Sequence, residues 1–178
     1  MRPLCCGAGC AQDYPPAGIA AVPRVVLESA LSRSDFPDHH VIAEELTENV
    51  IDLEGHDLVV VPLGHTDTGN TTCLHVPSIG LVVTGDAACN GVHLYLGESD
   101  SEKRRELIAA LDKIESLNPR AVIAGHKRAE NDDSPRIIEE TRQYIRDFDR
   151  IVDATTTARE FYDRMLEICP DRVNPGAL

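Results

Sequence analysis

Apolar residues in the first half of the chain recur in short runs with a strand period. The run at 58–63 is β-branched and continuously apolar, which is typical of a strand that is buried on both faces. A turn sequence at 77–80 separates two such runs and predicts a β-hairpin. The strands predicted in this half cover residues 41–43, 50–53, 58–63, 71–76 and 81–84.

After residue 98 the apolar positions repeat at steps of three and four residues, which predicts amphipathic helices. Ser99-x-x-Glu102 has the pattern of a capping box at the start of the first of them. The elements predicted in this half are a helix ending near residue 117, a buried strand at 120–124, and helices beginning at Ser134-Pro135 and Thr157. Strands followed by helices predict an α/β or α+β fold, with a mixed sheet covered by helices.

The first residues of the chain follow neither period. Residues 1–23 are rich in Gly, Ala, Pro and Cys and predict a disordered or non-native leader, so that the domain would cover 24–178. Asp13, Pro15 and Pro16 interrupt the apolar stretch that a signal peptide requires, which favours a cytoplasmic protein. The six cysteines form no pair of the Cys-x-x-Cys type, and we expect them to be reduced.

Charge restricts the class of partner. The chain has 178 residues, with 17 basic and 30 acidic side chains, which gives a net charge of −13. This field repels a phosphate backbone and an anionic membrane surface, and no apolar run approaches the ~20 residues of a membrane-spanning helix. We therefore expect a small-molecule substrate, and neither nucleic acid nor membrane as a partner.

Metal-capable side chains follow three of the predicted strands. His65 comes after the strand at 58–63, Asp86 after the strand at 81–84, and His126 after the strand at 120–124. A glycine lies next to each, which allows the backbone to turn there. Histidine and carboxylate together suit Zn²⁺, Fe²⁺ or Mn²⁺, so these residues are candidate metal ligands.

Two further residues are candidates near these strand ends. Asp67 is a candidate catalytic carboxylate that orients His65, although a turn-forming aspartate beside Thr68 and Gly69 explains it equally well. His93 is a candidate substrate-binding residue, with an ordinary loop histidine as the alternative.

The motifs Gly64-His65-Thr66, Thr84-Gly85-Asp86 and Ala124-Gly125-His126, in this order, resemble the second half of a metallo-β-lactamase-fold hydrolase. The resemblance covers roughly residues 38 to 153. It implies an αββα sandwich with one or two zinc ions, or iron or manganese, at the edge of its sheets. It also implies that His65 ligates the first metal, that Asp86 bridges both metals and that His126 ligates the second. Family members open esters, thioesters, lactones or amides with metal-activated water.

The chain departs from the family pattern upstream of these motifs. The motif His-x-His-x-Asp-His is absent, and only His39 and His40 precede His56. Adjacent side chains of an extended segment point to opposite faces, so this pair cannot converge on one ion. We therefore expect the C-terminal half of such a hydrolase, truncated, with weak metal binding and little or no turnover. The alternative is a non-catalytic binding protein that keeps the scaffold and forms a homodimer through its exposed sheet.

Overall fold

The computed structural model describes residues 46–97 and 99–178 of the chain. The predicted leader, the strand predicted at 41–43, and His39 and His40 lie outside the described residues. The chain divides into two units, Met1–Val50 and Ile51–Leu178, and the candidate site residues all belong to the second unit.

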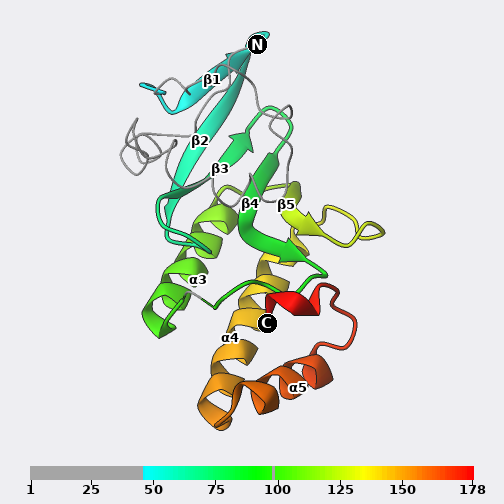
Figure 1. Ribbon diagram of the computed structural model, residues 1–178. Helices are drawn as coiled ribbons and strands as arrows, with labels where there is room; N and C mark the ends of the chain where they lie inside the picture. Colours follow the sequence, from blue (N-terminus) through cyan, green and yellow to red (C-terminus); the bar gives the residue numbers. More distant parts are fainter. Residues whose placement is uncertain (1–45, 98) are drawn as a thin grey trace, which may run out of the picture. The chain divides into compact units, whose positions relative to one another are not determined.

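Five strands form one mixed sheet in the order β1-β2-β3-β4-β5 (Figure 1). Strand β2 pairs with β3 and β3 with β4 in antiparallel fashion, whereas β4 and β5 are parallel. The hairpin predicted around the turn at 77–80 is therefore confirmed. The strands are β1 (Val50–Leu53), β2 (His56–Gly64), β3 (Thr71–Val76), β4 (Leu81–Asn90) and β5 (Ala121–Lys127).

Three helices complete the described part, together with a short 3₁₀ helix at the C-terminus. Helices α3 and α4 contact each other and β4, while α5 packs against α4 (Figure 1). This arrangement confirms the predicted α+β class, with helices covering a mixed sheet. The helices are α3 (Ser101–Ser116), α4 (Arg136–Ala154), α5 (Ala158–Ile168) and the 3₁₀ helix Pro175–Ala177.

The apolar stripes of α3 and α4 form the core with strands β4 and β5. Val82 on β4 and Val122 on β5 are fully buried in this core. Among the helical positions that the three- and four-residue period identified, Leu107, Leu111, Ile114, Ile137 and Ile145 are also fully buried, whereas Ile108 and Leu117 are only partly buried. The periodic pattern therefore predicted the core-facing side of both helices.

Strand β2 differs from the expectation of burial on both faces. Val60 and Leu63 are buried, but Val59 and Val61 are half-buried and Pro62 is exposed. The physical reason lies in its neighbours, because β2 contacts helix α3, whereas strand β4 contacts both α3 and α4.

The strand predicted at 81–84 is too short, because β4 continues to Asn90. Gly85 takes a φ of 56° there, and the register with β5 shifts on both sides of it. Asp86 therefore lies within β4, after this irregularity, and His126 lies within β5. Only His65 comes after the end of its strand, as predicted.

The predicted helix starts show one confirmed cap, one corrected cap and one start that is shifted by a residue. Thr157 accepts the Glu160 N–H at the start of α5, as predicted. Helix α3 is capped by Asp100 instead of Ser99, and its carboxylate accepts two backbone N–H groups at 3.0 and 2.8 Å. Helix α4 begins at Arg136, one residue later than predicted, but the hydroxyl of Ser134, the predicted N-cap, accepts the Arg136 N–H at 3.4 Å.

No helix among the described residues is long and apolar enough to cross a membrane.

Cys73 on β3 gives a direct test of core burial. Burial raises the pKa of this thiol to about 11, although the charge of Lys113 acts in the opposite direction. The thiolate is the nucleophile, so we expect iodoacetamide at pH 8 to alkylate Cys73 about 100-fold more slowly in the folded chain than in urea. Mass spectrometry of the labelled peptides measures both rates, with half-buried Cys169 as an internal comparison. Equal rates in both states would contradict the burial of β3.

Candidate functional site

The parallel pair β4 and β5 brings Asp86 and His126 together. Cys89 lies opposite His126 in the register of the two strands, although 37 residues separate them in sequence. His126 Nε2 lies 3.3 Å from Asp86 Oδ1, and the two side chains are 68% and 44% exposed. Two of the predicted metal ligands are therefore neighbours at the surface. Because both are accessible to water, their mutual attraction contributes little to stability.

Gly125 permits this close approach. A Cβ added at Gly125 would lie 2.5 Å from Asp86 Oδ1 and 2.9 Å from the carbonyl carbon of Gly85. The absence of a side chain at this position therefore lets β5 run close beside the Gly85-Asp86 segment. Gly125, the glycine next to His126 in the sequence, is therefore required for Asp86 and His126 to lie this close together.

His65 begins the loop that follows β2. Thr66 is buried, and its hydroxyl donates to Asp67 Oδ1 at 2.8 Å. Thr66 also contacts the Thr71 hydroxyl at 3.0 Å, which ties the loop to the start of β3. The hydrogen bond that Asp67 accepts within this loop thus agrees with the alternative interpretation of Asp67 as a turn-forming residue. Within the described part of the chain, His65 Nδ1 is buried and has no hydrogen-bond partner.

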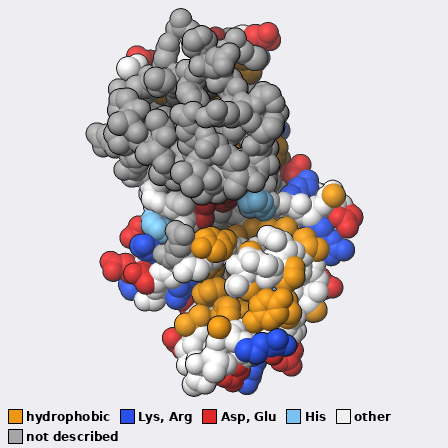
Figure 2. Space-filling model, in the orientation of Figure 1, with side chains coloured by type: hydrophobic (Ala, Val, Ile, Leu, Met, Phe, Trp, Pro, Cys, Tyr) orange, Lys and Arg blue, Asp and Glu red, His pale blue; other side chains and the backbone are white. Residues whose placement is uncertain are grey.

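A cavity of about 80 Å³ gathers four of the five candidate residues. Asp67, Asp86, His93 and His126 all contribute to its wall, whereas His65 does not. The rest of the wall includes Cys89 from β4 and Asn174 from the C-terminal turn. In the view of Figure 2, histidine side chains lie at the surface beside acidic and hydrophobic side chains.

His93 is a buried residue of this cavity wall. The sequence alone did not decide whether it is a substrate-binding residue or an ordinary loop histidine. Its side chain is 2% exposed, and Nδ1 lies 3.1 Å from the Tyr144 hydroxyl. Nε2 is buried without a hydrogen-bond partner in the described residues. Burial lowers the pKa of His93, and the positive charge of Arg172 lowers this pKa further. The ring is therefore neutral at pH 7.

Arg172 forms hydrogen bonds with two residues of the cavity wall. Its guanidinium donates to the Val92 carbonyl at 2.7 Å and to Cys89 Sγ at 3.2 Å. It also stacks over the Tyr144 ring, with 4.5 Å between the guanidinium carbon and the ring centroid. Neither Arg172 nor Tyr144 was identified as a site residue from the sequence, because about 80 and 50 residues separate them from Val92 and His93.

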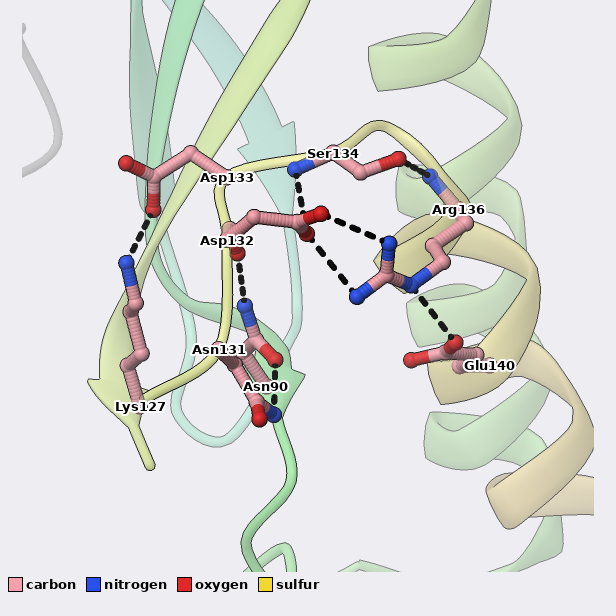
Figure 3. A network of polar contacts seen from close by, with 8 residues as sticks. All are labelled: Asn90, Lys127, Asn131, Asp132, Asp133, Ser134, Arg136 and Glu140. Carbon is pink, nitrogen blue, oxygen red and sulfur yellow. Dashed lines mark hydrogen bonds and ion pairs between the residues drawn. The ribbon is translucent and has the colours of Figure 1, made fainter. Parts of the chain in front are cut away.

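A polar network fixes the loop that follows β5 (Figure 3). Asn90 is 1% exposed, its amide donates to the Asp132 carbonyl at 2.7 Å, and its oxygen accepts from Asn131 at 2.7 Å. Asp132 also pairs with Arg136, and Lys127 pairs with Asp133 at 2.6 Å. These contacts bind the loop to the end of β4. The loop itself follows His126 closely in the sequence. The dipeptide Asn90-Gly91 at a strand end was the available signal for this anchor.

The described residues do not fit a complete catalytic zinc site. Such a site has three protein ligands and a water, and no group of three or more His, Cys, Asp or Glu side chains in the described part is placed to hold a metal. Asp86 and His126 are two adjacent donors, and the unpartnered His65 Nδ1 lies outside their cavity.

Solved structures with a similar fold include a metallo-beta-lactamase family protein from Thermus thermophilus. It is 17% identical, with a TM-score of 0.54, and the match covers 93% of this chain and 59% of that chain. A beta-lactamase domain protein from Burkholderia ambifaria is 15% identical, with a TM-score of 0.54 and coverage of 78% and 45%. At these identities the likeness shows the fold alone. The chain spans less than two thirds of the length of either structure.

A family model described as the metallo-beta-lactamase superfamily matches residues 9–126, which is more than half of the chain. The match begins inside the segment 1–23 that was predicted to be a leader, and the boundary between leader and domain stays a prediction. No curated protein matches the chain. The chain belongs to the metallo-beta-lactamase superfamily, whose fold is that of metal-dependent hydrolases and whose members generally bind metal ions.

Proposed function

We propose that this chain carries one half of a metallo-β-lactamase-type hydrolase site, with Asp86 and His126 as its principal metal donors and His65 as a further donor. The observation that carries the proposal is the Asp86–His126 pair at 3.3 Å on the wall of a cavity, in a chain of this superfamily. The reaction class is hydrolysis of an ester, thioester, lactone or amide of a small molecule.

The donor set supports weak binding of a divalent cation. A catalytic zinc ion normally has three protein ligands, whereas Asp86 and His126 supply two to one cavity. The chain also contains no His-x-His sequence that would add two imidazoles to one ion. We therefore propose that zinc, iron or manganese binds loosely and that this polypeptide by itself turns over slowly or not at all.

Acidity supports the choice of a small-molecule substrate. The net charge of −13 and the two carboxylates on the cavity wall disfavour polyanionic ligands. A cavity of about 80 Å³ accommodates a reacting group of a few heavy atoms, with the remainder of the substrate outside it.

Metal titration of alanine variants tests the proposed donors. We expect the dialysed wild-type chain to bind Zn²⁺ weakly by calorimetry, and Asp86→Ala and His126→Ala to weaken binding at least about tenfold, because each removes one of two donors. His56→Ala is the matched control, since His56 is an exposed histidine at the start of β2. Its zinc affinity should equal that of the wild type.

Elemental analysis of the purified chain measures how many metal ions each chain holds. Two tightly held ions per chain would contradict the proposal of an incomplete site. Unchanged zinc affinity in both Asp86→Ala and His126→Ala would remove the assignment of the donors. Hydrolysis of p-nitrophenyl acetate with and without added Zn²⁺ measures the residual activity, which we expect to be low.

A further inference from the structure

The hydrogen bonds around Tyr144 determine which nitrogen of His93 carries the proton. Tyr144 is 2% exposed, and the contact of its hydroxyl with His93 is buried. Its oxygen lies 3.1 Å from His93 Nδ1. An N–H donated by His93 would make this oxygen the acceptor and leave the buried hydroxyl proton unpaired, which costs free energy.

The arrangement that satisfies every group has the Tyr144 hydroxyl donating to His93 Nδ1. Nδ1 then acts as an acceptor and carries no proton. Because a neutral imidazole has one N–H, that proton must be on Nε2. The edge-on contact of the two rings, with centroids 5.9 Å apart, holds the imidazole in this orientation.

His93, whose Nε2 carries this proton, lines the cavity to which Asp86 and His126 also contribute. Nε2 is buried and has no acceptor within the described part of the chain. Buried donors in folded proteins are almost always paired, so an unpaired one in a cavity wall indicates a ligand that supplies the acceptor. The cavity wall also carries the carboxylates of Asp67 and Asp86, which favour an uncharged acceptor over an anionic one.

We infer that His93 Nε2–H donates a hydrogen bond to the carbonyl oxygen of a small uncharged acyl ligand, and that Tyr144 is the positioning residue that fixes this tautomer. The inference rests on the proposed function only in identifying the cavity as the substrate site. The tautomer and the binding of a small acyl probe are properties of the metal-free chain, so they are measured independently of metal loading and hydrolysis.

Long-range ¹H–¹⁵N NMR spectra of the ¹⁵N-labelled full chain test the tautomer. The spectrum of His93→Gln identifies the His93 signals by their absence. At pH 7.5 we expect wild-type His93 to show a protonated Nε2 and an unprotonated Nδ1. In Tyr144→Phe, which keeps the ring but removes the hydroxyl, we expect a mixture of both tautomers. A protonated Nδ1 in the wild type, or an unchanged tautomer in Tyr144→Phe, would overturn the inference.

Titration with γ-butyrolactone, an uncharged acyl compound, tests the donor. We expect it to shift the His93 Nε2 signal, and His93→Leu to weaken its binding about tenfold through loss of one hydrogen bond. His93→Gln is the matched variant, because its side-chain N–H₂ reaches the position of Nε2, and we expect it to retain the wild-type affinity within about threefold.

Acetate is the anionic comparison in the same titration. Equal affinity of His93→Leu and the wild type for γ-butyrolactone would overturn the role of Nε2 as donor. Stronger binding of acetate than of γ-butyrolactone would overturn the assignment of an uncharged ligand. If His93→Leu does not fold, the comparison of His93→Gln and Tyr144→Phe with the wild type decides, because both keep a side chain of similar size.

Discussion

Replacing Gly125 with alanine is expected to separate Asp86 from His126 and to lower the free energy of unfolding by about 1–3 kcal/mol. The added methyl group would lie 2.5 Å from Asp86 Oδ1 and about 3 Å from the Gly85 backbone. The carboxylate can rotate away, but the backbone of Gly85 has to shift together with β4. The φ of Gly125 is not in the left-handed region, so backbone strain contributes nothing and the effect is steric.

Urea unfolding measures the stability of this variant, and zinc titration measures the loss of the donor pair. Gly69→Ala is the matched control, because a Cβ there meets nothing within 4 Å and its φ is not left-handed. We expect Gly69→Ala to change the free energy of unfolding by less than about 0.5 kcal/mol. If Gly125→Ala has the same free energy of unfolding and the same zinc affinity as this control, that result would contradict the described packing of β5 against Gly85.

Leu111→Ala should have the larger effect on stability, a loss of about 3 kcal/mol in the free energy of unfolding. Leu111 is 0% exposed in helix α3, which packs against α4 and β4. Alanine has the higher helix propensity, so the helix itself is not weakened and the loss reports the packing of the side chain. Thermal and urea unfolding of the full chain provide the measurement.

Ile108→Ala on the same helix separates core packing from a general effect on α3. Ile108 is only partly buried at the edge of the core, and we expect a loss of about 1 kcal/mol from it. A cost for Leu111→Ala no greater than that for Ile108→Ala would show that the centre of the core does not lie between α3 and α4.

Local patterns predicted the elements well where one periodicity persisted to the end of the element. Strand β3 has the predicted bounds, and Thr157 caps α5 as predicted. Strand β4 was predicted too short because Gly85-Asp86 resembles a turn. In the structure, pairing with β5 continues past Gly85 through shifts of register, and these are long-range interactions without a local signal.

For the candidate site as well, local patterns were predictive and long-range contacts were not. The residue types and their order made Asp86 and His126 candidate metal ligands, and the parallel pairing of β4 with β5 explains why these residues, far apart in the chain, are neighbours. The support around His93 was not predictable, because Tyr144 and Arg172 reach it from other elements. Tyr144 appeared in the sequence only as one position on the apolar face of α4, where it was indistinguishable from an ordinary core residue.

The C-terminal turn has a practical consequence for work on this protein. Val173 accepts the His93 N–H at 2.9 Å and pairs with Val92, and Asn174 and Ala177 form part of the cavity wall. Leu178 directly follows Ala177 of the cavity wall, so we expect a sequence fused to Leu178 to hinder the access of small ligands to the cavity. Purification tags for the binding experiments belong on the other terminus, or should be cleaved before the first titration.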